Sequence, residues 1–460
     1  MAKRFFGRSR ELAALRGKFE QPGFQMAVVY GRRRVGKTSI INRFIDSVEC
    51  KAVSFVSLER DEREQLAMLG DSALSALAPD MLGTVGFDSF ERVFSFVANA
   101  ARGERVILFI DEYPYLAKEC RYMNSLLQRF IDNEWKETQL YLVLCGSLVS
   151  FMREDVLGES APLHGRSTLE LKVRPMGYRD SAAFVPRYSN EDKAIVYGLT
   201  GGVPKYLEQF DDAKSLERNI VDEFYEDSGY FTEEQVQTLV TADRSNPAAF
   251  NAIISAVASG HTKYSEIATS SGLGDISYYL KSLVSADILE RRVSSGKPYY
   301  VLADAMLRFW FNYVSRAASL INAGRGELYY ERIVKSRLHE HMGPVFEEMA
   351  RQFLFENMGT DVFPCFATDI TNYQNAFKTD GEVRQVELDL VGTENKRIVF
   401  AGECKFRNQR FGKGDMSALL EKVALLPARD PDVVAFSLGG FTDEARGAKA
   451  FLYDIGDLYR

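Results

Sequence analysis

The chain has 460 residues, of which 46% are hydrophobic and 26% charged, and its formal net charge is −7. This length predicts roughly three or four domains, and the composition is typical of an ordinary globular protein. The net negative charge argues against a protein whose whole surface binds nucleic acid.

The apolar and cysteine patterns disfavour several further classes of protein. The longest apolar stretch, around residues 140–152, is too short and too interrupted to span a bilayer, and the basic N-terminus lacks the apolar region of a signal peptide. The five cysteines are far apart and include no CxxC pair, so neither a disulfide framework nor a zinc site is indicated. His339 and His341 do not share a helix face, and we expect both on the surface. We therefore expect a cytoplasmic protein with no membrane partner.

A phosphate-binding loop is predicted near the N-terminus. Residues 26–30 are a short apolar run typical of a buried strand, and residues 39–45 are typical of the start of a helix. Between them, residues 31–38 match the Walker A pattern G-x-x-x-x-G-K-[ST] at every fixed position. Backbone N–H groups of such a loop surround phosphate oxygens, Lys37 would reach the β- and γ-phosphates, and the Thr38 hydroxyl would bind Mg²⁺. The pattern predicts ATP as the cofactor, bound by Gly31, Arg34, Val35, Gly36, Lys37, Thr38 and Ser39.

A Walker B pattern follows. The apolar run 106–110 ends in Asp111 and Glu112, so a buried strand would deliver two carboxylates beside the phosphate loop. Asp111 would hold Mg²⁺ and Glu112 would polarise the attacking water, because metal binding and base catalysis are separate tasks. The next predicted strand, residues 140–145, leads to Ser147, which could sense the γ-phosphate. A catalytic glutamate with an intervening sensor strand favours the additional-strand branch of P-loop folds.

These motifs carry a family resemblance. The segment Phe6-Gly7-Arg8-x-x-Glu11-Leu12, the two Walker motifs and residues 199–204 (LTGGVP) together resemble the AAA+-like archaeal and bacterial ATPases close to the STAND class. In that group the N-terminal segment and the Gly-x-Pro turn of a helical lid enclose the adenine, which implies that Arg8 and Pro204 lie next to the nucleotide. The segment His164-Gly165-Arg166 resembles one that supplies a basic residue near the phosphates. Arg166 is thus a candidate arginine finger, in cis or in trans, with a purely structural arginine as the alternative.

The middle of the chain predicts three helices and a hairpin. Helices are expected around residues 253–257 and 264–268, and a third begins after Asp275. Residues 288–292 and 298–302 are strand-like runs around a turn, and the whole pattern is typical of a winged helix, a DNA-reading module. Between residues 251 and 300, however, five Lys or Arg face four Asp or Glu. DNA contact and a role as an interdomain or protein-binding spacer therefore remain alternatives. Residues 304–314 predict an aromatic-rich helix that belongs to the core or to a docking surface.

The C-terminal third predicts a nuclease-like domain. Strand-like runs at 386–391 and 398–402 carry Asp389 and lead to Glu403-Cys404-Lys405, the PD-(D/E)xK signature. Residues two apart in a strand face the same side, so Glu403 and Lys405 project together. Asp389 and Glu403 would hold Mg²⁺, and Lys405 would orient water and steady the phosphate charge. Glu347 matches the first-helix glutamate of that family, as a metal ligand or a residue behind the ligands. A basic cluster could guide the phosphate backbone: Lys396, Arg397, Lys405, Arg407, Arg410 and Lys413.

The order of these segments resembles an archaeal-type ATPase family with a C-terminal nuclease-like domain of unknown function. It predicts a multidomain α/β protein: a P-loop ATPase core with a parallel sheet of the additional-strand type, a helical lid, a winged helix, a linker and a restriction-endonuclease-like α/β domain. The predicted bounds are 1–175, 176–241, 242–315, 316–332 and 333–460.

The leading hypothesis is an ATP-hydrolysing protein that acts on DNA, in which the ATP state gates a Mg²⁺-dependent nuclease-like domain. The alternative is a STAND-like nucleotide switch whose C-terminal domain binds DNA or protein without cleaving. A scaffold with a vestigial ATPase is a third reading. The sequence also allows a homo-oligomer, and it does not indicate a particular protein partner.

Overall fold

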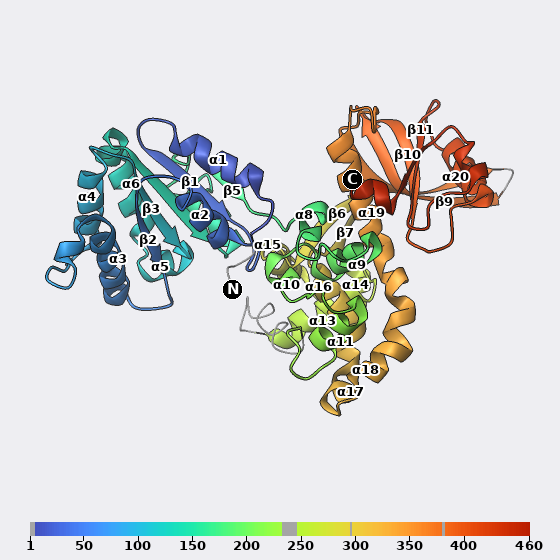
Figure 1. Cartoon of the computed structure of the whole chain (residues 1–460), viewed down its shortest axis with the longest axis horizontal. Coiled ribbons are helices and arrows are strands. Elements are labelled where there is room, and N and C mark those ends of the chain that lie inside the picture. Colours follow the sequence, from blue (N-terminus) through green and yellow to red (C-terminus); the bar gives the residue numbers. More distant parts are fainter. Residues whose placement is uncertain (1–4, 232–245, 295–296, 380–381) are drawn as a thin grey trace. The chain divides into compact units, whose positions relative to one another are not determined.

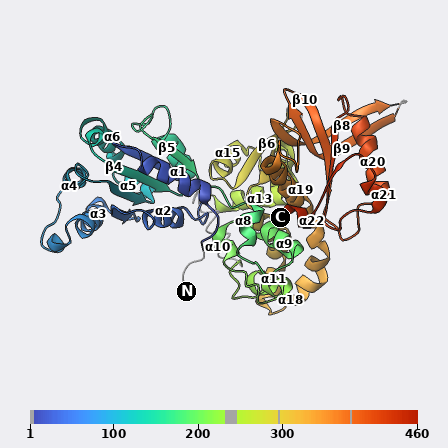
Figure 2. The same ribbon diagram turned by 45° about the horizontal axis from the view of Figure 1, so that its top comes forward.

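The structure is a computed structural model that describes residues 5–231, 246–294, 297–379 and 382–460 (Figures 1 and 2). The predicted lid beyond residue 231 and the centre of the predicted hairpin turn, residues 295–296, lie outside the described residues. Contacts divide the chain into two compact units. The first is Met1–Pro175 with Val203–Lys205 and Ser285–Asp287, and the second comprises the remaining residues.

The first unit is built on a five-stranded parallel sheet in the order β2-β3-β4-β1-β5. Strands β1, β3 and β4 are buried almost throughout, which explains their unbroken apolar runs. Strand β4 lies between β1 and β3, which confirms the predicted additional-strand arrangement. The strand bounds are β1 (Gln25–Tyr30), β2 (Lys51–Val56), β3 (Val106–Asp111), β4 (Leu140–Gly146) and β5 (Leu169–Lys172).

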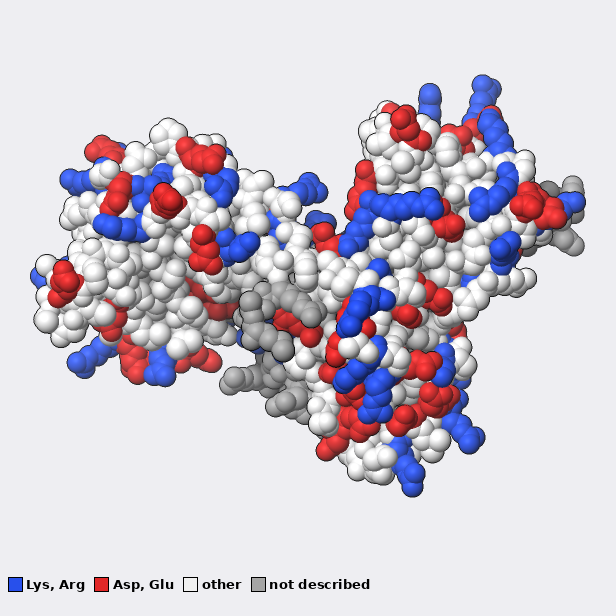
Figure 3. Space-filling view, viewed as in Figure 1, with Lys and Arg blue, Asp and Glu red and all other residues white. Residues whose placement is uncertain are grey.

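Helices cover both faces of this sheet. One core joins the strands to α1 (Ser9–Phe19) and α2 (Lys37–Ile45). The opposite core joins them to four helices, α3 (Glu62–Leu77), α4 (Phe90–Ala100), α5 (Tyr113–Glu119) and α6 (Met123–Asn133). A short helix, α7 (Val149–Phe151), and a π-helical turn (Met152–Val156) follow β4. On the face shown in Figure 3, acidic and basic side chains are interspersed over the described residues of this unit.

The second unit begins with the lid helices α8 (Tyr178–Ala182), α9 (Asn190–Thr200) and α11 (Leu216–Phe224). The short α10 (Pro204–Leu207) starts within the segment that belongs to the first unit. The three helices predicted next are present, and β6 and β7 form an antiparallel pair. Their bounds are α13 (Pro247–Ala258), α14 (Tyr264–Ser271), α15 (Ser277–Ser285), β6 (Leu289–Ser294) and β7 (Lys297–Leu302).

The segment that the sequence suggests as a linker, residues 316–332, is largely helical. It contains α17 (Ala318–Asn322) and α18 (Gly326–Tyr329) and runs into a π-helical turn that begins at Tyr330. Tyr330 is fully buried, and a Cβ atom at Gly326 would overlap the carbonyl oxygen of Tyr225. This glycine therefore allows a close approach of two backbones and does not mark a flexible connection.

The aromatic segment 304–314 belongs to the core. Asp304 caps α16 (Ala305–Phe309), and the Phe309 ring packs against Phe224 at 5.0 Å and His341 at 5.3 Å. The expectation that His341 lies on the surface is wrong, because it occupies the buried side of its helix. Burial and the nearby Arg308 lower the pKa of His341 to about 3. His339 is partly exposed, and its Nε2 lies 3.0 Å from a carboxylate oxygen of Glu191.

The C-terminal part is a second five-stranded sheet, in the order β12-β11-β10-β9-β8. Strands β8, β9 and β10 pair antiparallel, whereas β10, β11 and β12 pair parallel. The predicted strands 386–391 and 398–402 lie in β9 and β10. The bounds are β8 (Asp369–Thr379), β9 (Glu382–Glu394), β10 (Arg397–Lys405), β11 (Asp432–Ser437) and β12 (Phe451–Asp454).

Helices α19 (Leu338–Asn357) and α20 (Lys413–Ala424) lie on opposite faces of this second sheet (Figure 2). The α20 face forms one core with Leu388 and Ala401, whereas α19 places Phe353 against Phe436 at 5.7 Å. Two short helices, α21 (Asp443–Arg446) and α22 (Ile455–Leu458), complete the fold. None of the described helices combines the length and hydrophobicity needed to cross a bilayer, and all five cysteines are free thiols.

Gly31→Ala tests the packing of the phosphate loop. A Cβ atom at Gly31 would overlap the carbonyl oxygen of Val173, which is backbone and cannot move alone. We expect the substitution to lower the free energy of unfolding by about 1–3 kcal/mol and to weaken nucleotide binding. The control is Gly17→Ala in α1, where a Cβ atom meets nothing and the change should stabilise by up to about 1 kcal/mol. Equal stability of the two variants in urea unfolding would contradict this account.

Candidate functional site

The predicted phosphate loop connects the end of β1 to the start of α2. Gly36 caps α2 in a left-handed conformation, at φ 92°, which glycine adopts without strain. The Lys37 ammonium is nearly buried, and it donates hydrogen bonds to the carbonyl oxygens of Gly31 at 2.9 Å and Arg32 at 3.1 Å. Lys37 thus folds back over the loop, where phosphates would compete for its protons. Ser39 follows in the first turn of the helix.

The candidate Mg²⁺ ligands of this loop contact each other. The Thr38 hydroxyl donates a 2.6 Å hydrogen bond to Oδ2 of Asp111, which ends β3 and is 3% exposed. Hydroxyl and carboxylate oxygens are the ligands that Mg²⁺ prefers, and one or two of them suffice beside substrate phosphates. The pair therefore fits a Mg²⁺ ion that accompanies a nucleotide.

The predicted base and the predicted sensor are also joined. Oε2 of Glu112 accepts a 2.8 Å hydrogen bond from the Ser147 hydroxyl and one of 3.2 Å from the Ser147 backbone N–H. Glu112 has a left-handed backbone, at φ 48°, where the chain turns from β3 into α5. Because β3 and β4 are parallel neighbours, their carboxyl ends bring these two residues together.

Two residues nominated by the family resemblance reach the same loop. The Arg8 guanidinium donates to the carbonyl oxygens of Val35 and Arg174, each at 2.8 Å, and to Glu11 at 2.9 Å. Arg8 therefore ties the N-terminal segment to the phosphate loop through backbone atoms. Pro204 lies on the other side, with Cγ 3.7 Å from the position of a Cβ atom on Gly36.

Arg166 is engaged elsewhere. Its guanidinium forms a two-pronged pair with Asp132 of α6, at 2.9 and 2.7 Å, and also donates to the carbonyl oxygens of Pro162 and His164. The Asp132 pair raises the pKa of Arg166 and lowers that of Asp132. These contacts favour the structural alternative, and a role in hydrolysis stays a prediction.

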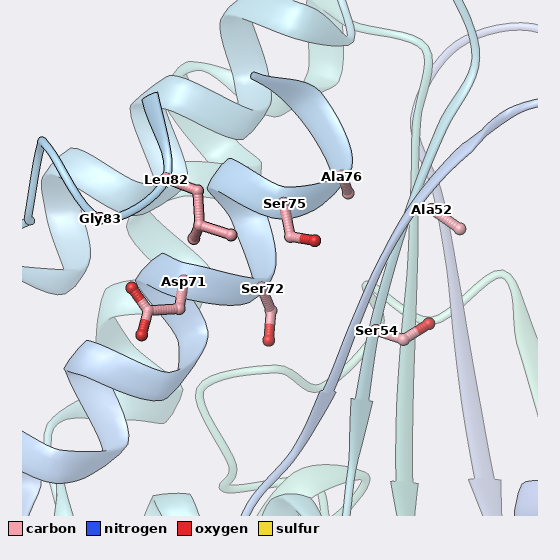
Figure 4. Close-up of a pocket in the computed structure, with 8 residues that line it drawn as sticks. All are labelled: Ala52, Ser54, Asp71, Ser72, Ser75, Ala76, Leu82 and Gly83. Atoms are coloured by element: carbon pink, nitrogen blue, oxygen red, sulfur yellow. The ribbon is translucent and has the colours of Figure 1, made fainter. Parts of the chain in front are cut away.

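A separate hollow of about 670 Å³ opens in the first unit, and it contains none of the predicted site residues. It borders β2, one of the two edge strands of the sheet, whereas the phosphate loop follows β1. Figure 4 shows the residues around it, most of them small or hydroxyl-bearing, together with an aspartate and a leucine: Ala52, Ser54, Asp71, Ser72, Ser75, Ala76, Leu82 and Gly83.

In the second unit, the predicted Asp389, Glu403 and Lys405 are brought together. Nζ of Lys405 lies 2.8 Å from Oε2 of Glu403, as expected for residues two apart in a strand. Oδ2 of Asp389 accepts a 2.8 Å hydrogen bond from the backbone N–H of Cys404. Burial raises the pKa of Asp389, and so does the charge of Glu403. The pKa of Glu403 is lowered, because hydrogen bonds from two lysines outweigh its burial.

A β-bulge in β9 lies at Asp389. Between the pairs Thr371–Val391 and Tyr373–Leu388, β8 advances by two residues and β9 by three. The extra residue of β9 interrupts the alternation of side chains at Asp389, a device common beside active sites. The irregularity could not be read from the spacing of Asp389 and Glu403.

Glu347 lies on α19, and Asn372 of β8 donates a 3.0 Å hydrogen bond to its carboxylate. Burial and the charge of Asp389 raise the pKa of Glu347 to about 7. Among the residues that the structure describes, no three His, Cys, Asp or Glu side chains are grouped to hold a metal ion. The predicted set of three carboxylates is therefore not assembled, because Glu347 comes from the sheet face opposite α20. Asp389 and Glu403 remain as a pair, and Mg²⁺ is commonly held by two carboxylates and water.

Sequence reasoning missed Lys422. Its ammonium, on α20, contacts Oε1 of Glu403, nineteen residues away in the chain. No motif marks a lysine at that position. The basic cluster expected on both sides of Glu403 is also divided: Arg397 begins β10 and Lys405 ends it, roughly 26 Å apart along a strand. Arg407 is paired with Asp415 at 2.7 Å.

Ser147→Ala tests the contact between sensor and base. Removing the hydroxyl leaves Glu112 with only the longer backbone hydrogen bond, so its carboxylate is held less firmly. We expect ATP affinity to stay within about twofold, and the hydrolysis rate to fall roughly tenfold, about 1.4 kcal/mol. Steady-state turnover and nucleotide titration measure the two effects, with Ser150→Ala as the matched control. Faster hydrolysis would show instead that Ser147 restrains Glu112.

Comparisons with known proteins agree with this geometry. Residues 5–210 match an ATPase domain found predominantly in Archaea, and residues 310–416 match a family of archaeal and bacterial proteins of unknown function. The uncharacterized protein MJECL04 of Methanocaldococcus jannaschii is 30% identical over 468 residues, which cover 99% of this chain and 100% of that protein. The uncharacterized ATP-binding protein MJ0423 of the same organism is 38% identical over 50 residues, 11% of this chain and 85% of that protein.

Among solved structures, the Walker-type ATPase PABY2304 of Pyrococcus abyssi superposes with a TM-score of 0.51. It shares 18% sequence identity, covers 67% of this chain and is itself covered to 96%, so the likeness concerns the fold. The full-length relative, the matched ATPase domain and the assembled Walker residues lead to one conclusion: the chain belongs to the family that includes MJECL04, and it carries a P-loop ATPase domain of the kind found predominantly in Archaea.

Proposed function

We propose that this ATPase acts on DNA and that its ATP state controls a metal-dependent phosphodiesterase centre in the C-terminal domain. The observation that carries the proposal is the gathering of Asp389, from the interior of β9, with Glu403 and Lys405 at the end of the paired strand β10. Two acidic residues and a lysine, partly withdrawn from water, are the residue types that phosphodiester hydrolysis needs.

In the ATPase unit, each residue has a separate task. Lys37 would exchange its two carbonyl acceptors for the β- and γ-phosphate oxygens, and Thr38 and Asp111 would hold Mg²⁺. The cation, when bound, supplies positive charge beside the phosphates. Glu112 would accept a proton from the attacking water, and Ser147 positions its carboxylate through the 2.8 Å hydrogen bond.

In the C-terminal domain, Asp389 and Glu403 would hold a divalent cation, which would supply charge to polarise the phosphodiester. Lys405 stands beside them and can donate a hydrogen bond to a water or to a phosphate oxygen. Lys405 keeps its positive charge: its ammonium group is partly buried, but the hydrogen bond to Glu403 raises its pKa. Glu347 would act on this pair from behind the ligands, through Asp389, since the charge of Asp389 raises the pKa of Glu347.

Residues 247–302, the three helices with the hairpin, are proposed as a winged helix that contacts DNA. The candidate recognition helix, α15, contributes a single basic side chain, Lys281. We therefore expect this module to add modestly to affinity, because phosphate contacts by Lys and Arg dominate DNA binding.

Helix α9 supports coupling between the two activities. Its start contacts α19 through Glu191 and His339, and farther along Tyr197 accepts a 2.9 Å hydrogen bond from Gln352. The chain then turns at Gly201 and reaches Pro204, beside the phosphate loop. The His339 ring also packs on Phe406, at 5.4 Å, next to Lys405. The packed pair of α9 and α19 thus contacts Phe406, the residue after Lys405, and α9 is joined to Pro204 through the chain.

Cleavage can be tested directly on supercoiled, linear and single-stranded DNA with Mg²⁺, with and without ATP. We expect cleavage by the wild type, none with EDTA, and at least about a hundredfold loss for Lys405→Ala, since a positioned charge at the phosphate is removed. Lys449→Ala, an exposed change in the same domain, should retain activity. No cleavage by protein that still binds ATP would contradict the proposal.

His339→Ala tests the coupling. The substitution removes the contacts with Glu191 and Phe406 but touches neither candidate centre. We expect ATP turnover and the basal cleavage rate to stay unchanged, while the effect of ATP on cleavage shrinks by about threefold or more. Glu340→Ala, the exposed neighbour, serves as control. An undiminished ATP effect would show that coupling takes another route.

A second candidate function is a STAND-like nucleotide switch whose C-terminal domain binds without cleaving. One observation favours it: both carboxylate oxygens of Glu403 are already bonded to lysines. In that case ATP should change the assembly state, measured by light scattering, while turnover stays slow. Steady turnover stimulated by DNA would exclude the switch.

A further inference from the structure

Glu403 has one more positive partner than the predicted motif requires. Lys405 contacts its Oε2 and Lys422 contacts its Oε1, so each carboxylate oxygen has its own ammonium group. The Glu403 side chain is only 6% exposed. Its charge is therefore balanced within the protein and not by water.

The need for this second lysine follows from the surrounding charges. The charge of Glu403 disfavours the ionised form of Asp389. A buried and a partly buried carboxylate without a cation would be costly, because their attraction to water is largely lost. Lys405 alone supplies one positive charge for two negative ones. Lys422 supplies the second.

The position that Lys422 occupies matters for metal binding. A divalent cation shared by Asp389 and Glu403 needs an oxygen of each residue, and Oε1 of Glu403 is covered by the Lys422 ammonium. Lys405 projects from the same strand as Glu403, so its position relative to Glu403 is fixed by that strand. Lys422 reaches across from α20 on a flexible four-carbon stem, and its side chain is 35% exposed, so it can turn into water.

We propose that Lys422 is a built-in counter-ion, which occupies Oε1 of Glu403 when no divalent cation is bound and releases it when one binds. This inference rests on the proposed metal centre of the C-terminal domain. It gives the centre two states, one in which a lysine balances the carboxylates and one in which a metal ion does.

The test is Mn²⁺ binding to the full-length chain without nucleotide, measured by isothermal titration calorimetry. Asp389→Asn defines the signal, because only binding lost in that variant belongs to the C-terminal centre. We expect Lys422→Met, which keeps the length of the stem, to bind Mn²⁺ about three- to tenfold more tightly than the wild type, because a competing ion pair is gone. Lys422→Arg should resemble the wild type, and Lys413→Met on the same helix should change nothing.

The outcomes separate the two proposals. Equal or weaker Mn²⁺ binding by Lys422→Met, with Asp389-dependent binding intact, would overturn the role of Lys422 and leave the metal centre standing. No Asp389-dependent binding in any variant would overturn both. Thermal unfolding in EDTA checks that each variant is folded, and the increase in melting temperature on adding Mn²⁺ should be larger for Lys422→Met. If that variant does not fold, Lys422→Gln carries the same expectation.

Discussion

The hydrogen bond between Thr38 and Asp111 joins the two halves of the ATP site, and the parallel sheet makes it possible. Strands β1, β3 and β4 run in one direction, so the residues that follow them meet at one edge although they are far apart in the chain. The loop after β1 brings Thr38, the end of β3 brings Asp111 and Glu112, and β4 brings Ser147. Insertion of β4 between β1 and β3 places the sensor within reach of the base. The burial of these strands therefore does more than stabilise the fold, because it sets the distances of the catalytic groups.

The C-terminal centre follows a different logic. Glu403 is buried and Asp389 partly buried, so the fold must supply positive charge near them. Lys405 and Lys422, on the two oxygens of Glu403, supply it. Neither carboxylate is surrounded by water as that of a surface residue would be.

Much of the architecture could be predicted because it rests on local patterns. Apolar runs and short spacings in the sequence predict the Walker loop, the buried strands and the group of Asp389, Glu403 and Lys405. What could not be predicted depended on contacts between distant elements. Asp132 holds Arg166 and Lys422 reaches Glu403, and no spacing rule connects those residues. The burial of His341 was missed because spacing shows that two histidines face different sides, but not which side meets the core.

The close packing of Gly326 on Tyr225 has a consequence for how the chain can be divided. Gly326 packs against Tyr225, which follows α11, and Gln352 of α19 donates a hydrogen bond to Tyr197 of α9. The second sheet therefore has no independent boundary near residue 332. A fragment cut there would uncover Tyr330 and Val334, whose side chains are buried in the intact chain. The first compact unit also contains residues 203–205 and 285–287, so no single cut in the chain separates it from the rest. An exchange of modules between relatives would therefore have to transfer these two short segments together with residues 1–175.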